Sequence, residues 1–267
     1  MTQAASQTPA ITPEIAVIVP VRNEEANIGP LIDEISQALA GVPHEIVYVD
    51  DGSTDGTLAA LAAAAPGRPL RVLRHASSCG QSAAVVTGVK AARAPWIATL
   101  DGDGQNDPAD IPALWARAKA ESAARGQTVL VAGHRVTRKD TRIKRISSRI
   151  ANRIRVALLH DETPDTGCGL KVFSRALFLD LPHFDHMHRY LPALTLRQGG
   201  AVVSEPVNHR PRLRGVSNYG TLDRLMVSFM DLMGVIWLQR RWKRPAITPV
   251  EFPAALPASQ PGTPPAA

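Results

Sequence analysis

The hydrophobic positions of this chain fall into short apolar runs that alternate with stretches of helical spacing. The runs lie within residues 15–21, 44–52, 69–76, 95–104 and 128–135, and each predicts a buried β-strand. Helical patterns separate them, over residues 25–40, 54–65, 82–92 and 110–126. This alternation predicts an α/β fold with a mostly parallel sheet flanked by helices.

The two ends of the chain differ in composition from its centre. Residues 1–13 are polar and contain two prolines, and residues 245–267 are rich in Pro and Ala, so we expect a disordered leader and a disordered tail. The folded domain is expected over residues 14–220. An amphipathic helix that faces a membrane or a partner is expected over residues 221–244. No secretory signal or membrane-spanning run is expected, which favours a cytoplasmic location.

The net charge indicates which kinds of partner to expect, and the cysteine content indicates whether disulfides or a zinc site are to be expected. The formal net charge of +6 favours an anionic partner such as a nucleotide or a phospholipid surface. Aromatic residues make up only 4%, too few to stack on bases beside the basic segments, so nucleic acid is not expected. The cysteines, Cys79 and Cys168, are too few and too scattered for a disulfide framework or a zinc site.

Acidic residues follow two of the predicted strands at the point where each strand ends. Asp50 and Asp51 follow the second strand, and Asp101 and Asp103 follow the fourth. Open α/β sheets bind ligands at the carboxyl ends of their strands, so we expect these four acids to face a common hollow. Four carboxylates would repel one another, and a divalent cation bound to a diphosphate would offset that repulsion. Mg²⁺ or Mn²⁺ is therefore expected there.

The usual phosphate-binding loops are absent from the sequence. The first strand is followed by PVRNEEANIG, not by G-x-G-x-x-G, and no Walker pattern occurs. A phosphate group would then be held through the metal and by arginines. Arg135 follows the fifth strand and could bind a phosphate bidentately.

Six motifs, in this order, resemble the family 2 glycosyltransferases of GT-A fold, most closely their polyprenyl-phosphate (dolichol-phosphate mannose synthase-like) branch. They are IAVIVPVRNEEANI, EIVYVDDGSTDGT, ATLDGDGQNDP, AGHR, DTGCGLKVFSR and RLRGVSNYG. The resemblance implies a nucleotide-sugar site with a metal at its centre. Its nucleotide part would comprise Pro20, Arg22, Glu24, Val49 and Asp51. The metal and diphosphate part would comprise Asp101, Gly102, Asp103, Gln105 and Arg135.

A basic segment over residues 140–160 points to the acceptor. Isoleucines recur at helical spacing, and arginines that include Arg145, Arg149 and Arg155 fill the positions between them. Such a helix suits an anionic membrane surface or a lipid phosphate, although an ordinary surface helix has the same pattern. Arg212, Arg214 and Ser217 are further candidates to hold the acceptor phosphate.

The predicted helix over residues 221–244 carries one apolar face and ends in a basic cluster. The face comprises Leu222, Leu225, Met226, Phe229, Leu232, Met233, Ile236 and Trp237. Asp223, Arg224 and Asp231 disfavour a transmembrane span. The helix could lie in the headgroup plane of a membrane, or it could pack on its own domain or on a partner.

The segment HDETPDTGCGLKVFSR predicts a tight turn near the reacting sugar. A lipid phosphate acceptor is already ionised at neutral pH, and Asp165 would then orient a substrate. A sugar hydroxyl acceptor would need a base, and Asp165 is the candidate. Cys168 is expected to be a packing residue. His183, His186 and His188 lack a consistent spacing for a metal and are expected in a loop or on the surface.

These observations favour an inverting glycosyltransferase that moves a hexose from a nucleotide sugar, GDP-mannose or UDP-hexose, to a polyprenyl phosphate. Asp103, Asp165 and Arg135 are its candidate catalytic residues, with Asp101, Asp103 and Gln105 at the metal. The enzyme would lie on the inner face of the membrane, with a membrane-protein partner as a further possibility. Two alternatives remain: the same fold acting on a soluble glycan hydroxyl, and a non-catalytic protein that docks to a membrane partner.

Overall fold

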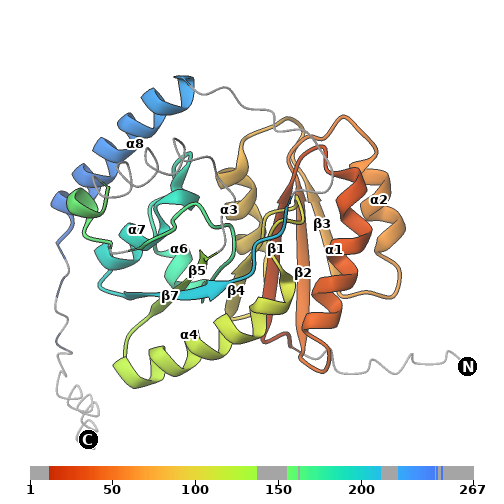
Figure 1. Cartoon of the computed structure of the whole chain (residues 1–267), viewed down its shortest axis with the longest axis horizontal. Coiled ribbons are helices and arrows are strands. Elements are labelled where there is room, and N and C mark those ends of the chain that lie inside the picture. Colours follow the sequence, from red (N-terminus) through yellow and green to blue (C-terminus); the bar gives the residue numbers. More distant parts are fainter. Residues whose placement is uncertain are drawn as a thin grey trace, which may run out of the picture.

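A computed structural model describes residues 12–136, 155–161, 163–211 and 222–243, together with Pro245 and Thr248. For residues 222–228 only the backbone is described. A seven-stranded sheet forms the centre, in the order β3-β2-β1-β4-β6-β5-β7 (Figure 1). The strands are β1 (Ile15–Val21), β2 (His44–Asp50), β3 (Leu70–Arg74), β4 (Trp96–Thr99), β5 (Val129–Arg135), β6 (Lys171–Ser174) and β7 (Ala201–Val207).

The sheet is mostly parallel, as the strand–helix alternation predicts. β1 pairs in parallel with β2 and β4, β2 with β3, and β5 with β7. The exception is β6, which is antiparallel to both β4 and β5. β6 and β7 are additions to the five strands that the apolar runs predict. Because β6 runs the opposite way, its first residues lie at the edge where β4 ends.

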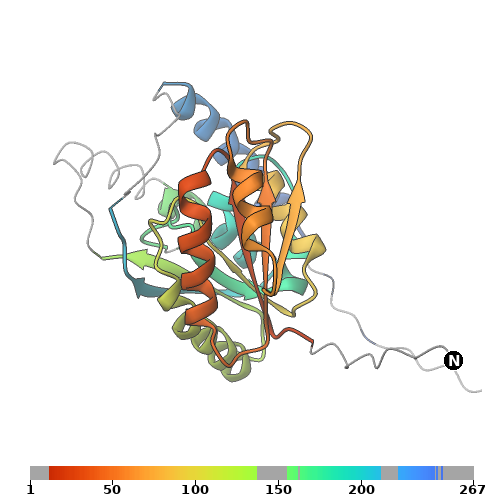
Figure 2. The same ribbon diagram turned by 90° about the vertical axis from the view of Figure 1, so that its right-hand side faces the viewer.

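Helices cover both faces of the sheet, which gives three layers. α1 (Glu25–Ala38), α2 (Thr57–Ala64) and α4 (Ile111–Arg125) lie on one face. Figure 2 shows α1 and α2 in front of the sheet. On the other face lie α3 (Gln81–Ala91), α6 (Arg175–Leu179), α7 (Leu191–Arg197) and α8 (Leu222–Arg241). Two short 3₁₀ helices, η1 (Pro108–Asp110) and η2 (Met187–Arg189), precede α4 and α7.

Alternation along β1, an interior strand, builds a core on each side of the sheet. Ile15, Val17 and Val19 of β1 pack into the cluster beneath α1, α2 and α4. Ala16 and Ile18 point the other way, into the cluster beneath α3, α6 and α7. Successive side chains of a strand point to opposite faces, so an uninterrupted apolar run is what a sheet covered on both sides requires.

α8 packs against α7 with part of its apolar surface and exposes the rest. Leu232, Val235 and Ile236 join the core cluster that contains α7, whereas Phe229 and Trp237 are both 59% exposed. The expectation of a single apolar face is therefore wrong for the part of α8 whose side chains are described: there the apolar residues divide between an inner and an outer face. Among the described residues, no helix is long and apolar enough to cross a membrane.

Candidate functional site

The carboxyl ends of β1, β2 and β4 lie side by side at one edge of the sheet. These three strands are parallel and adjacent, and Val21 of β1 is level with Asp50 of β2. The backbone N–H of Asp51 then donates to the carbonyl of Val21 (2.9 Å), and that of Leu100 to Ile18 (3.0 Å). The loops that follow these strands therefore meet at the edge where open α/β sheets bind ligands.

A pocket opens beside Asp101 at this edge. Its polar lining comes from four elements that are far apart in sequence: the end of β4, the start of α3, β6 and η2. The polar residues are Gln81, Thr99, Asp101, Lys171 and His188. Pro20, Val85, Leu100, Gly169 and Leu191 complete the wall. The pocket is small, with an apolar floor and convergent polar groups, as expected of a ligand site.

Asp101 is the acidic centre of this pocket. Burial, and then the nearby charge of Asp103, raise the pKa of the Asp101 carboxyl, while Lys171 acts in the opposite direction. The Gln81 side-chain amide donates a hydrogen bond to Asp101 Oδ1 (2.8 Å). Gly169 lies against the same carboxylate, and a β-carbon at this position would collide with it. Asp101 is therefore held from two sides.

Asp103 and Gln105 lie in the turn that follows Asp101. Asp103 Oδ1 accepts a hydrogen bond from the backbone N–H of Gln105 (3.1 Å). Gly102 is buried against Val21, which leaves no room for a β-carbon. Two half-buried carboxylates, of which Asp103 raises the pKa of Asp101, are a donor set that suits a hard divalent cation. The residues present fit the expected metal.

Arg135 and Asp165 form a bidentate ion pair next to this pocket. Arg135 Nε donates to Asp165 Oδ2 (2.6 Å), and Nη2 donates to Oδ1 (2.7 Å). The side chains are only 14% and 6% exposed. Burial disfavours the guanidinium charge, but the bonds to Asp165 more than compensate and raise the pKa of Arg135. The sequence suggested that Arg135 binds a phosphate bidentately. In the structure its Nε and Nη2 donors are both hydrogen-bonded to Asp165.

Lys171 carries a buried positive charge behind Asp101. The residue is 3% exposed, and its Nζ donates to the backbone carbonyls of Thr166 (3.4 Å) and Cys168. Burial lowers the pKa of the ammonium, whereas the negative charges of Asp101 and Asp165 favour the charged form. Lys171 thus ties the turn that carries Asp165 to the sheet and places a cation near Asp101.

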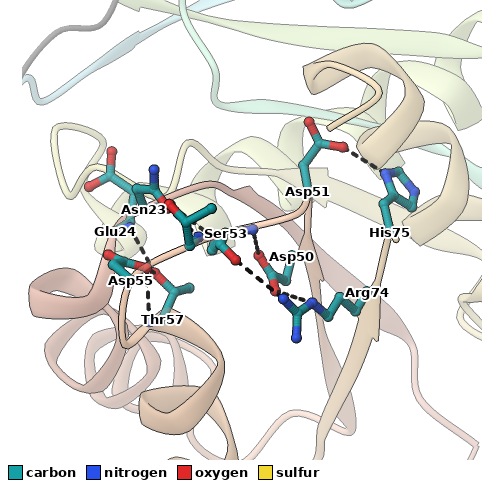
Figure 3. Close-up of polar contacts among 10 residues, drawn as sticks. Asn23, Glu24, Asp50, Asp51, Ser53, Asp55, Thr57, Arg74 and His75 are labelled. Carbon is teal, nitrogen blue, oxygen red and sulfur yellow. Dashed lines mark hydrogen bonds and ion pairs between the residues drawn. The ribbon is translucent and has the colours of Figure 1, made fainter. Parts of the chain in front are cut away.

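Asp50 and Asp51 have different partners from each other (Figure 3), and neither shares the Gln81 partner of Asp101. Asp50 is fully buried, accepts from the backbone N–H of Ser53 (2.9 Å) and pairs with Arg74 (3.3 Å). Asp50, Asp51 and Asp103 are not among the residues that line the pocket at Asp101. The expectation that all four acids face one hollow is therefore wrong: Asp50 and Asp51 are paired with a local arginine, a histidine and loop amides instead.

Asp51 nevertheless influences the pocket indirectly, because it holds the loop that leads into α3. Its carboxylate accepts hydrogen bonds from Ser78 Oγ and from the backbone N–H groups of Cys79 and Gly80 (2.7, 2.8 and 2.9 Å). Burial opposes ionisation, but these bonds and that to His75 lower the pKa of Asp51. The next residue, Gln81, bonds to Asp101. Asp51 therefore shapes the loop that holds Asp101.

Asp51, His75 and Cys79 have potential metal-ligand atoms within 4.8 Å of one another. His75 Nδ1, however, is hydrogen-bonded to Asp51 (2.7 Å) and Nε2 to Thr87 (2.9 Å). The imidazole has no ring nitrogen left for an ion, so this cluster is a hydrogen-bond network.

The other predicted nucleotide residues are dispersed along the same edge. Pro20 lines the pocket, and Arg22 is exposed beside it in sequence. Glu24 accepts from Asn27 Nδ2 (2.6 Å) at the start of α1, and its backbone N–H donates to Thr57 (2.9 Å). Val49 is fully buried in the core beneath α3, so its side chain is inaccessible to a nucleotide, contrary to expectation.

Most of the predicted acceptor residues lie outside the described residues: Arg145, Arg149, Arg212, Arg214 and Ser217. Arg155 is described, and it is not part of an exposed basic face. Its guanidinium is 11% exposed and donates to Asp161 (3.0 Å) and to the carbonyl of Thr163 (2.5 Å). This arginine is a structural residue, which ties a helical segment at residues 155–159 to the loop that follows it.

Sequence reasoning missed Gln81, Lys171 and His188. Lys171 had a detectable signal, since it is a single charge in the apolar run LKVF. The expectation that His188 lies in a surface loop is wrong, because it is half-buried in the pocket wall, whereas His183 is exposed as expected. His186 contacts Asp231 of α8 (3.0 Å). Nothing local to the sequence distinguishes these three histidines.

Comparison with known sequences places this geometry in context. The profile of Glycosyl transferase family 2 matches residues 16–181. A dodecaprenyl-phosphate galacturonate synthase of Rhizobium johnstonii is 35% identical over 242 residues, which cover 87% of this chain and 69% of that protein. An undecaprenyl-phosphate 4-deoxy-4-formamido-L-arabinose transferase of Enterobacter sp. is 31% identical, over 84% of this chain and 65% of that protein. The chain thus spans about two thirds of their lengths.

Solved structures share the fold. Glucosyl-3-phosphoglycerate synthase from Mycobacterium tuberculosis, in complex with Mn²⁺, UDP-glucose and phosphoglyceric acid, superimposes with a TM-score of 0.61 at 23% identity. The match covers 85% of this chain and 79% of that one. The same enzyme has been solved with Mg²⁺ and UDP, at a TM-score of 0.59 and 22% identity. At this identity the likeness concerns the fold.

Proposed function

This chain belongs to glycosyl transferase family 2, and we propose that it transfers a sugar from a nucleotide sugar to a polyprenyl phosphate. An oxygen of the lipid phosphate attacks the anomeric carbon as the bond from that carbon to the nucleoside diphosphate breaks, which inverts the configuration. The names of the two relatives support the acceptor class. The pocket at the ends of β1 and β4 is where the reacting sugar would lie.

Asp101 and Asp103 would hold Mg²⁺ or Mn²⁺, with Gln105 beside them. When bound, such an ion supplies Lewis-acid stabilisation of the departing diphosphate. The protein's own part is to keep the two carboxylates in place. Gln81 and Gly169 restrain Asp101, and the positive charge of Lys171 favours its ionised form. Preorganised charge of this kind is commonly the largest contribution to catalysis.

The ion pair between Arg135 and Asp165 is the observation that carries the choice of acceptor. A sugar hydroxyl must lose a proton to attack, and Asp165 is the carboxylate the sequence offered as base. In the structure both Asp165 oxygens accept hydrogen bonds from Arg135. A carboxylate bound to a guanidinium is a poor proton acceptor. A phosphomonoester, with a second pKa of about 6, needs no base. The occupied Asp165 therefore favours a phosphate acceptor.

The outer face of α8 supports a location at a membrane surface. Phe229, Met230, Met233 and Trp237 are each more than half exposed, and Arg240, Arg241 and Lys243 follow. Apolar residues beside a cationic cluster suit the interface of an anionic bilayer. The inner face of α8 is fixed to the domain, so binding through the outer face would hold the pocket near the lipid acceptor.

The proposal is tested by offering labelled nucleotide sugars to the purified protein with Mn²⁺ and undecaprenyl phosphate in detergent. Label extractable into organic solvent is the expected result. A soluble glycan offered in place of the lipid should accept none. Label that enters only the glycan, or no transfer to any acceptor while the nucleotide sugar binds, would contradict the proposed acceptor.

A further inference from the structure

His188 lies in the wall of the pocket at Asp101, although it belongs to η2, which is 87 positions further along the chain. Its neighbours in that wall include Gln81, Asp101 and Lys171. The imidazole is joined to α3 through Ser82, which is 1% exposed. Because α3 is anchored to β1 and β2 by its own core residues, this bond fixes the ring relative to the sheet.

The hydrogen bonds at Ser82 determine which ring nitrogen of His188 carries the proton. Ser82 Oγ lies 2.7 Å from His188 Nδ1, and it accepts a second bond from the His188 backbone N–H (3.3 Å). If Nδ1 carried the proton, the Ser82 hydroxyl would be an acceptor twice, and its own hydrogen would be buried without a partner. That arrangement is costly, so the hydroxyl donates to Nδ1. The proton of the neutral ring is then on Nε2.

Nε2–H is consequently a hydrogen-bond donor without a partner among the described residues. It is not one of the buried polar atoms that are sealed from solvent. Burial, and then the positive charges of Lys171 and Arg189, lower the pKa of His188 to about 3. The ring is therefore neutral at physiological pH and can donate one hydrogen bond into the pocket.

The pocket that His188 lines has the chemistry to hold a sugar. Its wall combines the polar side chains of Gln81, Asp101 and His188 with apolar residues such as Val85 and Leu191. The sugar of a nucleotide sugar is attached to the diphosphate, so a diphosphate at Asp101 and Asp103 would place the sugar within reach of the wall that holds His188.

We propose that Nε2–H of His188 donates a hydrogen bond to a hydroxyl of the sugar being transferred, which makes His188 a residue that selects the donor sugar. Ser82 is a positioning residue, because it sets the tautomer and the orientation of the ring. The inference rests on the proposed function only in that the ligand is a nucleotide sugar; it does not depend on the acceptor.

The test compares a nucleotide sugar with its nucleoside diphosphate by titration calorimetry, in Mn²⁺ and without acceptor. UDP-galacturonic acid, UDP-glucose and GDP-mannose, with UDP and GDP, are the probes. His188→Phe should weaken binding of the preferred nucleotide sugar about five- to tenfold, the value of one hydrogen bond, and leave the diphosphate affinity unchanged. His188→Gln, which retains a donor near Nε2, should recover part of the loss. His183→Gln, an exposed histidine of the same loop, should bind like the wild type.

Two further measurements make the result decisive. Ser82→Ala should also weaken sugar binding alone, and deoxy analogues of the sugar should identify one hydroxyl whose removal cancels the effect of His188→Gln. These arms remain informative if His188→Phe fails to fold. Equal losses for nucleotide sugar and diphosphate, or a change confined to the KM of the acceptor, would overturn the assignment. Failed transfer to lipid with intact sugar binding would count against the proposed function alone.

Discussion

The α-carbon of Gly169 lies directly against the carboxylate of Asp101, so that no side chain fits between the turn before β6 and the end of β4. Thr99 donates to the carbonyl of the same glycine (2.7 Å), which locks the two segments together. The position of the carboxylate that we propose binds the metal therefore depends on a residue 68 positions away in the chain. This contact leads to the first prediction.

Gly169→Ala should displace Asp101 and weaken metal-dependent binding of a nucleoside diphosphate. The added methyl group must push the carboxylate or the turn aside, and overpacking of this kind costs about 1–3 kcal/mol. Calorimetry with Mn²⁺ and UDP or GDP measures the binding, and urea denaturation measures the stability. Gly29→Ala is the matched control, because open space surrounds Gly29 in α1 and alanine there should stabilise the helix by about 0.5–1 kcal/mol. Unchanged diphosphate binding by Gly169→Ala would argue against the restraint.

Asp165 and Arg135 should behave as a coupled structural pair. The side chain of Arg135 is 14% exposed and that of Asp165 is 6% exposed. Asp165→Asn or Arg135→Gln leaves the other charge buried without its partner, so each should destabilise the fold by about 3–5 kcal/mol. The double variant should lose less than the sum of the two single losses. Chemical denaturation of the four proteins gives the coupling. Additive losses would show that the pair contributes nothing as a pair. If Asp165→Asn instead removed only the dependence of the transfer rate on the ionisation of a carboxylate, Asp165 would be identified as a general base.

Lys171→Met should raise the pH below which affinity for the metal is lost. The ammonium lowers the pKa of Asp101, so its removal raises that pKa further, and a carboxylate must be ionised to bind a cation. As the pH falls, affinity for Mn²⁺ is then lost at a higher pH than in the wild type. Calorimetric titration from pH 8 to pH 5 would follow the shift. Lys90→Met, which removes an exposed lysine of α3, should retain the wild-type profile.

Because the pKa of His188 is lowered in the folded protein, the free energy of unfolding should decrease as the pH decreases. In the unfolded chain a histidine has a pKa of about 6.5, whereas in the folded protein that of His188 is about 3. Below pH 6.5 the unfolded state therefore binds a proton that the folded state does not. The free energy of unfolding falls by up to about 1.4 kcal/mol per pH unit from this group. Urea melts of His188→Gln between pH 7.5 and 5 should show a shallower slope than the wild type and than His183→Gln. Equal slopes would contradict the burial of a neutral ring.

The outer face of α8 should bind anionic vesicles. Phe229 and Trp237 are well exposed, and burying such a side chain contributes about 1.5–3 kcal/mol, so the variant with Phe229→Ser and Trp237→Ser should lose at least about tenfold in vesicle affinity. Co-sedimentation with phosphatidylglycerol vesicles measures this, and phosphatidylcholine vesicles test the role of Arg240 and Arg241. Ala62→Ser with Ala63→Ser, at exposed positions of α2, is the control. Equal sedimentation of both variants would remove the support for a membrane role of this face.

The hydrophobic pattern by itself determined the two-sided sheet. Runs such as IAVIVPV can be buried only where helices cover both faces, and their spacing identified β1 to β5 and the four long helices between them. The motif LDGDG was recognisable for a similar reason, since two acids and two glycines at the end of a buried strand have a chemical meaning without any partner. Fold class and the centre of the site could both be predicted from local sequence.

Only the tertiary structure decided which side chains face that centre. The antiparallel direction of β6 brings Lys171 and Gly169 to Asp101, and the packing of η2 on α3 brings His188 there. Asp50 forms an ion pair with Arg74 and does not line the pocket, and Arg135 forms an ion pair with Asp165. Strand direction, long-range packing and the pairing of charges depend on the free energy of the whole chain, because each is a choice among distant partners. Periodicity reports only which face of an element is buried.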